Sequence, residues 1–150
     1  MSRVVAIHVT PERGGKTRGV DSARLFARRG IEGDHRCLRT TPKEPRSGVD
    51  VTLIEAEALA AAKREYELEI SPAECRRNVL TEGVALNHLV GREFKLGSAL
   101  LRGVELCEPC GHLESLTRKG AVKALIHRGG LRCDVIQDGA VRPGDSITPI

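Results

Sequence analysis

The residues best suited to chemistry lie in one short segment, residues 106–114 (Leu-Cys-Glu-Pro-Cys-Gly-His-Leu-Glu), which contains a Cys-x-x-Cys pair. Pro109 restrains the backbone before Cys110, and Gly111 after it permits the close approach of another group. His112 would orient or charge the site. A thiolate in such a loop is suited to binding a soft metal or carrying sulfur. The alternative is that Cys107 and Cys110 are small buried hydrophobic residues at the end of a strand.

Three familiar uses of a Cys-x-x-Cys pair fit this chain less well. Attachment of haem needs a histidine directly after the second cysteine, where this sequence has Gly111. A zinc site needs four ligands and, without a second such pair, His112, Cys133 or Cys75 would have to complete the set. A thioredoxin-like redox pair needs the N-terminus of a helix beside a βαβ unit, whereas the surrounding pattern predicts strands.

Two further segments carry polar groups of the kind that bind anions. Arg76, Arg77 and Asn78 place two guanidinium groups and an amide at the predicted start of a strand, although a double arginine is also common on a solvated face. Residues 127–131 (His-Arg-Gly-Gly-Leu) form a glycine-rich turn. Its N–H groups would hold an anion, or the turn would simply end a helix.

A fourth segment, residues 30–36 (Gly-Ile-Glu-Gly-Asp-His-Arg), places Asp34 and its polar neighbours at a tight turn. The alternative is an ordinary turn stabilised by the aspartate side chain. The chain has neither a P-loop pattern nor a Gly-x-Gly-x-x-Gly pattern, so the sequence gives no support to a nucleotide site of either type.

The composition limits the classes of protein to which the chain belongs. Its 150 residues suffice for one domain, and its 40% apolar and 29% charged residues are ordinary for a globular protein. Only 2% of the residues are aromatic, which argues against a protein that stacks single-stranded nucleic acid. The net charge is +4, and the basic residues are 18 Arg and 6 Lys. Residues 1–50 have a net charge of +5, and residues 51–150 have a net charge of −1. This arginine excess favours an anionic ligand or a solvated basic surface.

The sequence shows no signal peptide and no stretch long enough to span a membrane. We therefore expect a cytoplasmic protein with no membrane or nucleic-acid partner. Its five cysteines are expected to be thiols rather than disulfides.

Many short β-rich segments alternate with a few helical ones. The strongest helix is expected over residues 55–66, where acidic side chains come first and basic ones later, as the helix dipole favours. A short helix is expected over residues 121–127, and Asp138 and Gly139 predict a hairpin turn. Strands are expected over residues 3–9, 22–28, 51–54, 75–80, 94–96, 99–106, 131–136 and 146–150. Together these elements predict a mainly β fold, a barrel or a sandwich, with two or three inserted helices.

Taken together and in this order, these segments resemble the MOSC domain. This is the C-terminal domain of molybdenum-cofactor sulfurases, and it also occurs as small stand-alone bacterial proteins. The resemblance extends over residues 1–150 as a single domain, and the ordered set is more specific than any one motif. The segments that carry it are residues 4–8 (Val-Val-Ala-Ile-His), 29–34 (Arg-Gly-Ile-Glu-Gly-Asp), 76–80 (Arg-Arg-Asn-Val-Leu), 89–97 (Leu-Val-Gly-Arg-Glu-Phe-Lys-Leu-Gly), 108–113 (Glu-Pro-Cys-Gly-His-Leu), 127–131 and 141–145 (Val-Arg-Pro-Gly-Asp).

The resemblance implies a closed, mainly β barrel of complex topology with two or three inserted helices. It implies one signature cysteine late in the chain, which corresponds to Cys110 and would ligate molybdenum or carry sulfur. In relatives an Arg-x-Asn element lies beside the pterin and the phosphate of molybdopterin, and this element corresponds to Arg76 and Asn78. The further residues expected to contact this cofactor are Arg77, His112, His127, Arg128 and Asp34.

Two departures from the family pattern bear on function. Many stand-alone relatives have a His-Gly-Gly-x-Asp segment, where this chain reads Arg-Ser-Gly-Val-Asp over residues 46–50, so part of their site is missing or rebuilt. Cys107 is an extra thiol, which would resolve a persulfide or sulfenate on Cys110 or would belong to the core.

Three functions follow. The first is a molybdenum-cofactor-binding oxidoreductase that reduces N-hydroxylated compounds, with Cys110 as metal ligand and electrons from a partner protein or a small reductant. The second is a persulfide carrier or cofactor-delivery protein that uses Cys110, with Cys107 as resolving thiol and a sulfur-donor protein as partner. The third is a zinc-stabilised or structural binding module in which both cysteines are ligands or core.

Overall fold

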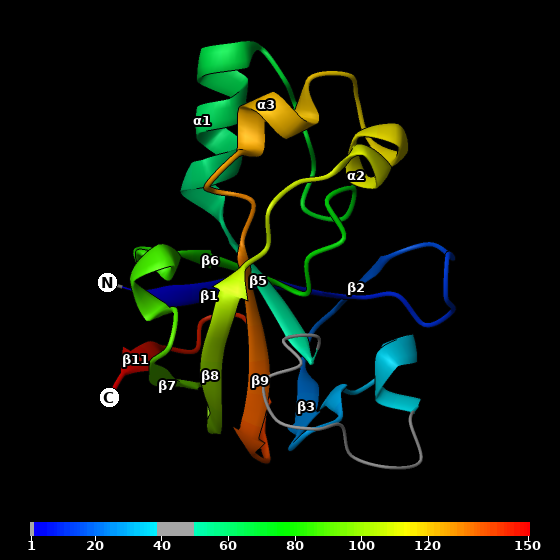
Figure 1. Ribbon diagram of the computed structural model, residues 1–150. Coiled ribbons are helices and arrows are strands. Elements are labelled where there is room, and N and C mark those ends of the chain that lie inside the picture. The colour runs from blue at the N-terminus through cyan, green and yellow to red at the C-terminus, as the bar shows by residue number, and fades with distance from the viewer. Residues whose placement is uncertain (1, 39–49) are drawn as a thin grey trace.

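The computed structural model describes residues 2–38 and 50–150, which form a β-rich body with its helices gathered at one end (Figure 1). The helices there are α1 (Ala56–Tyr66), α2 (Gly111–Leu116) and α3 (Ala121–Leu125). Two 3-10 helices, η1 (His35–Leu38) and η2 (Leu86–Leu89), lie in connections between strands. Within these ranges, no helix combines the length and the apolar character that crossing a bilayer requires.

The strands form two sheets. The smaller sheet has the order β10 (Gly139–Val141), β3 (Ala23–Phe26) and β4 (Gly30–Ile31). In the larger sheet all neighbours are antiparallel except β5 and β6, which are parallel because α1 carries the chain back between them. Its order is β11 (Ile147–Pro149), β7 (Glu93–Leu96), β8 (Ala99–Leu106), β9 (Leu131–Gln137), β5 (Val51–Glu55), β6 (Val79–Glu82), β1 (Arg3–Val9) and β2 (Arg18–Val20).

The fold is mainly β, as predicted, but over the described residues neither sheet closes into a barrel. The two ends of the larger sheet approach each other only near the chain termini, which lie close together (Figure 1). There, Arg3 and Ser146 form a single bridge, and the N–H of Val4 donates to the carbonyl of Asp145 at 2.8 Å. Most of β1 pairs with β6 and β2, so only its first residues can contact the segment that precedes β11. The expected closed barrel is therefore wrong for this structure.

Two apolar clusters hold the fold together. The larger lies among the strands and contains the buried side chains of Phe94, Leu101 and Leu131. The smaller lies beneath the helices, where Ile54 and Leu125 pack with the thiol-bearing residue Cys75. Alternation of buried and exposed residues along β7 and β3 directs every second side chain into the larger cluster. The smaller cluster supports the loops that carry the chemistry-bearing residues.

Most of the predicted elements are confirmed. The strand over residues 3–9, the helix starting at residue 56 and the hairpin of β7 and β8 are present. Helix α2 was not expected after Cys110, because a six-residue element that begins with glycine has too little periodicity to be recognised.

The hairpin predicted at Asp138 and Gly139 is wrong. The strand after this turn, β10, pairs with β3 rather than with the preceding strand β9, and Gly139 lies opposite Leu25. The Asp138 carboxylate accepts a hydrogen bond from the N–H of Ala27 at 2.7 Å, which holds the turn beside β3. The Asp-Gly pair therefore redirects the chain from one sheet to the other.

Candidate functional site

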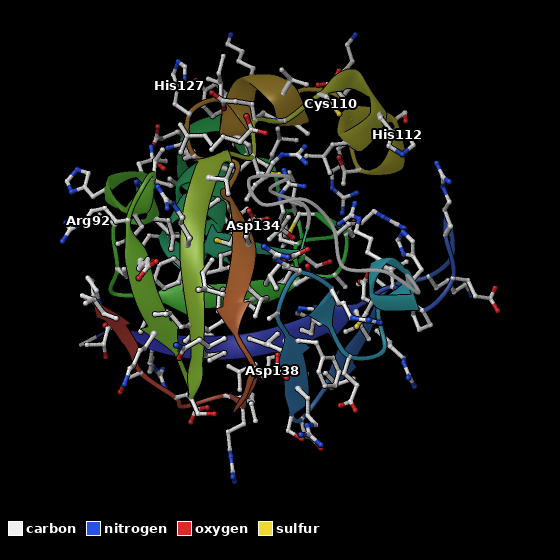
Figure 2. The ribbon with its side chains drawn as sticks, turned by 60° about the horizontal axis from the view of Figure 1, so that its bottom comes forward. Arg92, Cys110, His112, His127, Asp134 and Asp138 are labelled. Carbon is white, nitrogen blue, oxygen red and sulfur yellow. The ribbon has the colours of Figure 1, made fainter. Side chains whose placement is uncertain are left out.

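A cavity of about 510 Å³ brings together residues from six separate parts of the sequence. We call it the basic cavity, for the arginines described below. Of the residues predicted from the sequence, those that line it are Asp34, Arg76, Arg77, Cys107, Cys110 and His112. Figure 2 shows Cys110 and His112 close to each other, with His127 well apart from both. The structure thus separates the candidates into those that share a cavity and those that do not.

Cys110 is the exposed cysteine of this cavity. It is the residue immediately before α2, in extended conformation, and its thiol is not engaged in a disulfide. Cys107, three residues earlier, is buried but also lines the cavity. The two thiols therefore differ in their access to solvent and to a bound ligand, which favours Cys110 as the reactive group.

Two buried cysteines, Cys75 and Cys133, are poor nucleophiles. Burial raises the pKa of the Cys75 thiol, which also donates a hydrogen bond to the carbonyl of Pro72 at 3.0 Å. Burial raises the pKa of the Cys133 thiol still further. Both remain protonated near neutral pH, and a thiol reacts as its thiolate.

Arg77 holds the cysteine loop in place. Its Nε donates to the carbonyl of Gly129 at 2.8 Å, Nη1 donates to that of Cys75 at 3.2 Å, and Nη2 donates to that of Cys107 at 3.2 Å. A Cβ on Gly129 would lie 2.5 Å from the carbonyl oxygen of Cys107, so glycine is needed for this close approach. The guanidinium of Arg77 lines the cavity, but the three N–H groups that point to carbonyls chiefly fix the backbone before Cys110.

Arg76 lies in the left-handed region, with φ of 59°. This conformation costs a residue with a Cβ about 1 kcal/mol. The side chain reaches the glycine-rich loop after β1, where Nη1 donates to the carbonyl of Gly15 at 2.9 Å. Arg76 thus connects the lining of the cavity to the loop after β1, while Arg77 donates to carbonyls on the other side of the cysteine loop.

Asn78 is buried behind the cavity and does not line it. Its Oδ1 accepts from the N–H of Thr52 at 3.0 Å, and its Nδ2 donates to the carbonyl of His8 at 3.1 Å and to Oδ2 of Asp34 at 3.2 Å. The amide is therefore occupied within the protein. The structure places Asn78 as a support for Thr52 and Asp34, and its amide does not line the cavity.

Asp34 is buried at the base of the cavity and organises the turn around it. Its Oδ2 accepts from the N–H of Thr10 at 3.0 Å, and its Oδ1 accepts from the N–H of Arg36 at 3.2 Å. The neighbouring His35 also lines the cavity, a placement that the sequence did not reveal. The only signal was its position between Asp34 and Arg36, since nothing in the chain order shows that this turn meets residues 75–77.

Three further arginines complete the basic lining, namely Arg36, which belongs to the polar turn noted in the sequence, and Arg13 and Arg132, which the sequence did not single out. With Arg76 and Arg77 they make five arginines against one acidic residue, Asp34. Within the described ranges, Arg132 lies 3.9 Å from the carboxylate of Glu105, and no carboxylate pairs with the other four. Five guanidinium groups around a cavity with one buried carboxylate create a strongly positive field that favours an anionic ligand.

His127 and Arg128 do not line this cavity. The ring Nδ1 of His127 lies 2.9 Å from Oε2 of Glu108, and its backbone N–H donates to Oε1 of the same residue at 2.7 Å. Arg128 donates to the carbonyl of Ala124 and to the carboxylate of Glu65, and this hydrogen bond lowers the pKa of Glu65. The expected contacts of His127 and Arg128 with a cofactor are thus not supported by their placement.

The described residues offer no group of three or more His, Cys, Asp or Glu side chains able to hold a metal ion. The zinc alternative therefore gains no support from this part of the chain. A ligand held by one thiol and by charge remains compatible with the basic cavity.

A model of the MOSC domain family matches residues 46–148, more than two thirds of the chain. The chain belongs to the MOSC domain family. This family is associated with the molybdenum cofactor. A search of curated proteins finds no match to this MOSC domain.

Solved structures share the fold of this MOSC domain. The YuaD protein of Bacillus subtilis is 18% identical with a TM-score of 0.80, and the match covers 98% of this chain and 94% of that one. YiiM of Geobacillus stearothermophilus is 16% identical with a TM-score of 0.75, covering 100% and 75%. YiiM of Escherichia coli is 21% identical with a TM-score of 0.70, covering 99% and 69%. At these identities the likeness establishes the fold alone.

The segment that departs from the family pattern is only partly described. Residues 46–49 lie outside the described residues, so their contribution to the MOSC site is not assigned. Asp50, which ends the segment, is buried and lies away from the basic cavity.

Proposed function

We propose that this MOSC domain binds a molybdopterin-type cofactor in the basic cavity and acts in the cytoplasm as a small reductase of N-hydroxylated compounds. One observation carries the proposal: an exposed thiol, Cys110, shares a cavity of about 510 Å³ with five arginines. Thiolate is a soft ligand suited to molybdenum, and arginine is suited to phosphate.

The chemistry of the lining suits such a cofactor. Arg76, Arg13 and Arg36 would hold the phosphate, because within the described ranges they have no carboxylate partner to compete with it. Cys110 would ligate the metal, and His112, close to Cys110, would donate a hydrogen bond near its sulfur (Figure 2). Arg77 and Asn78 act behind these residues, one fixing the cysteine loop and the other fixing Asp34.

When bound, the cofactor would supply the two-electron chemistry that no side chain of this protein can perform. The chain would bind it, shield it from water and orient the substrate beside Cys110. Electrons would come from a partner protein or from a small reductant.

Elemental analysis and pterin fluorescence of the purified protein test the proposal. Protein made in a host that synthesises the cofactor should contain molybdenum and pterin in near-equal amounts, and Cys110→Ala should lose the molybdenum. Cys37→Ser is the matched control, because Cys37 lies outside the basic cavity and should retain both. Wild-type protein without molybdenum from such a host would refute the proposal.

A second candidate is a sulfur carrier with a persulfide on Cys110, supplied by a sulfur-donor protein. The observation that favours it is Cys107, a buried thiol in the same cavity that would resolve the persulfide. It predicts a gain of one sulfur atom in intact mass, which a reductant removes and Cys110→Ser abolishes. Sulfur uptake by the Cys110→Ser protein would exclude it.

A further inference from the structure

The imidazole ring of His35 is held in one orientation by hydrogen bonds to the backbone. Its backbone N–H donates to the carbonyl of Thr10 at 2.9 Å, and its ring Nδ1 lies 2.9 Å from the same oxygen. A carbonyl oxygen only accepts, so Nδ1 is the donor and carries the proton. Oδ1 of Asp34 lies 3.4 Å from the same nitrogen and strengthens this preference.

The group that orients His35 is itself fixed. Oδ2 of Asp34 receives hydrogen bonds from Thr10 and Asn78, and its side chain is only 5% exposed. Asp34 and Thr10 therefore cannot turn away from the ring without breaking buried hydrogen bonds. The imidazole of His35 is held on its Nδ1 side, and the side chain as a whole is 23% exposed.

The second nitrogen, Nε2, is the atom that His35 can present to a molecule in the cavity it lines. The other charged or titratable side chains around that cavity are five guanidinium groups, which stay protonated near neutral pH, three thiols, His112 and Asp34. The proposed function places His112 beside the sulfur of Cys110, which leaves His35 as the imidazole on the Asp34 side of the cavity. Asp34 is occupied by its own hydrogen bonds. A buried carboxylate, an imidazole fixed through Nδ1 and a free Nε2 together form the arrangement that general acid–base catalysis uses.

We infer that His35 donates a proton, through Nε2, to the substrate oxygen in this cavity. The inference rests on the proposed reductase function and adds a catalytic residue to it. Reduction of a hydroxylamine, R–NH–OH, breaks the N–O bond, consumes two electrons and two protons, and yields R–NH₂ and water. The electrons come from a low-potential donor such as reduced benzyl viologen. One proton comes from Nε2 of protonated His35, which regains it from solvent, and the other comes from solvent.

The first test needs neither cofactor nor turnover. Long-range ¹H–¹⁵N correlation spectra of uniformly labelled protein report which ring nitrogen of a neutral histidine carries its proton. We expect the Nδ1–H form for His35, identified by loss of its signals in His35→Asn. His88→Gln, at an exposed position on η2 outside the cavity, should leave these signals in place. A neutral ring protonated on Nε2 would overturn the inference.

The second test uses the loaded protein, phenylhydroxylamine as substrate and reduced benzyl viologen as donor, with aniline as the measured product. His35→Ala should keep the wild-type content of molybdenum and pterin but lose turnover by about 100-fold or more. Added imidazole should restore at least a tenth of it, a rescue that a merely structural role would not show. His88→Gln should turn over like the wild type.

The outcomes separate the inference from the function on which it rests. Wild-type protein that holds no cofactor, or holds it and forms no aniline, refutes the reductase function and the role of His35 with it. Active wild type with an equally active His35→Ala, or with a defect that imidazole does not relieve, overturns the role of His35 and leaves the reductase function standing.

Discussion

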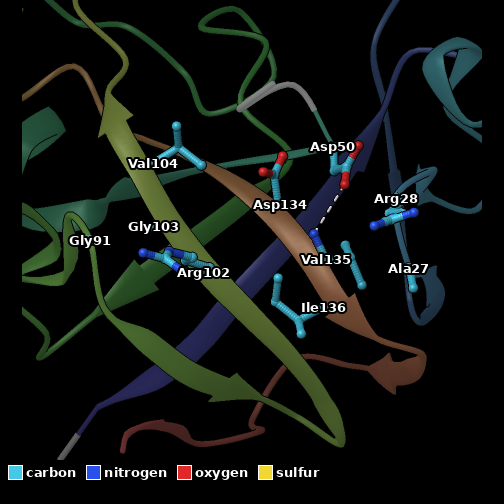
Figure 3. Close-up of a pocket in the computed structure, with 10 residues that line it drawn as sticks. All are labelled: Ala27, Arg28, Asp50, Gly91, Arg102, Gly103, Val104, Asp134, Val135 and Ile136. Atoms are coloured by element: carbon cyan, nitrogen blue, oxygen red, sulfur yellow. Dashed lines mark hydrogen bonds between the residues drawn. The ribbon is translucent and has the colours of Figure 1, made fainter. Parts of the chain in front are cut away.

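Two cavities of similar size lie beside strand β9, and they differ in the groups that line them. The basic cavity, about 510 Å³, holds five arginines and the thiols of Cys75, Cys107 and Cys110. The second cavity, about 610 Å³, is lined by two arginines, two aspartates and otherwise by apolar side chains and backbone (Figure 3). The described lining of the second cavity has no cysteine or histidine. The two cavities are therefore similar in volume and differ in the chemistry of their lining.

The contrast arises from neighbouring positions on the same strands. Arg132 and Asp134 are two residues apart on β9, so they point to the same face, yet one lines the basic cavity and the other the second cavity. On the neighbouring strand β5, Thr52 lies opposite Arg132. Asp50 comes two residues before Thr52, just outside the start of β5. The Asp50 carboxylate accepts from the N–H of Val135 at 3.1 Å (Figure 3). A shift of two residues thus changes the surface from one suited to anions to one that carries carboxylates.

Two glycine substitutions, one behind the cysteine loop and one at the second cavity, give the largest expected difference in stability. Gly129→Ala should destabilise the protein by about 3 kcal/mol, because the new Cβ would collide with the Cys107 carbonyl and with Pro109. At Gly91, in the second cavity, an added Cβ would have no atom within 4 Å. Gly91→Ala should therefore cost only about 1 kcal/mol, because the φ of 78° is unfavourable for a residue with a Cβ. Denaturant unfolding measures both values. Equal losses of stability would contradict the packing described for the cysteine loop.

Charge reversal compares the two cavities directly as ligand sites. Arg76→Glu should lower the pterin content of purified protein by about 30-fold, which corresponds to about 2 kcal/mol, because it replaces an attractive charge on the phosphate with a repulsive one. Arg102→Glu, the same change in the second cavity, should leave pterin content within about twofold. Fluorescence of the released pterin is the measurement. A larger loss in Arg102→Glu than in Arg76→Glu would show that the cofactor binds in the second cavity and not in the basic cavity.

Alkylation distinguishes the thiols within the basic cavity. At pH 8, iodoacetamide should modify Cys110 at least about tenfold faster than Cys75, because burial both shields Cys75 and raises its pKa. A raised pKa means less thiolate at a given pH, so the Cys75 rate should keep rising beyond the ordinary thiol value of 9.0, where an unperturbed thiol levels off. Peptide mass spectrometry at several pH values measures these rates. Modification of Cys75 first would show that Cys110 is not the accessible thiol.

Local patterns predicted much of the fold. Strand β1, helix α1 and the β7–β8 hairpin follow from alternation, helix propensity and a Gly-Ser turn, all of which act between residues close in sequence. Helix α2 and the pairing of β10 with β3 were missed. The first is too short to show a period, and the second depends on Asp138 reaching Ala27, more than 100 residues away in the chain.

For the site, residue types were informative and orientations were not. Cys110 and Arg76 were selected for their chemistry, and both line the basic cavity. Asn78 was selected on the same grounds but is turned inward, because its amide satisfies buried groups on β1 and β5. Whether a polar side chain faces a ligand or the protein depends on which distant groups it meets, and sequence spacing does not contain that information.

By itself, the sequence determined the mainly β character and the chief helix, since these depend on composition and on short-range periodicity. It also determined the candidate thiol, Cys110, through the resemblance to the MOSC domain. Only the tertiary structure decided that the sheet stays open, that Arg13, Arg36 and Arg132 join Arg76, and that His35 faces the same cavity. The physical reason is the same in each case. These contacts join residues tens of positions apart, and strand pairing, burial and the close approach at Gly129 set their geometry.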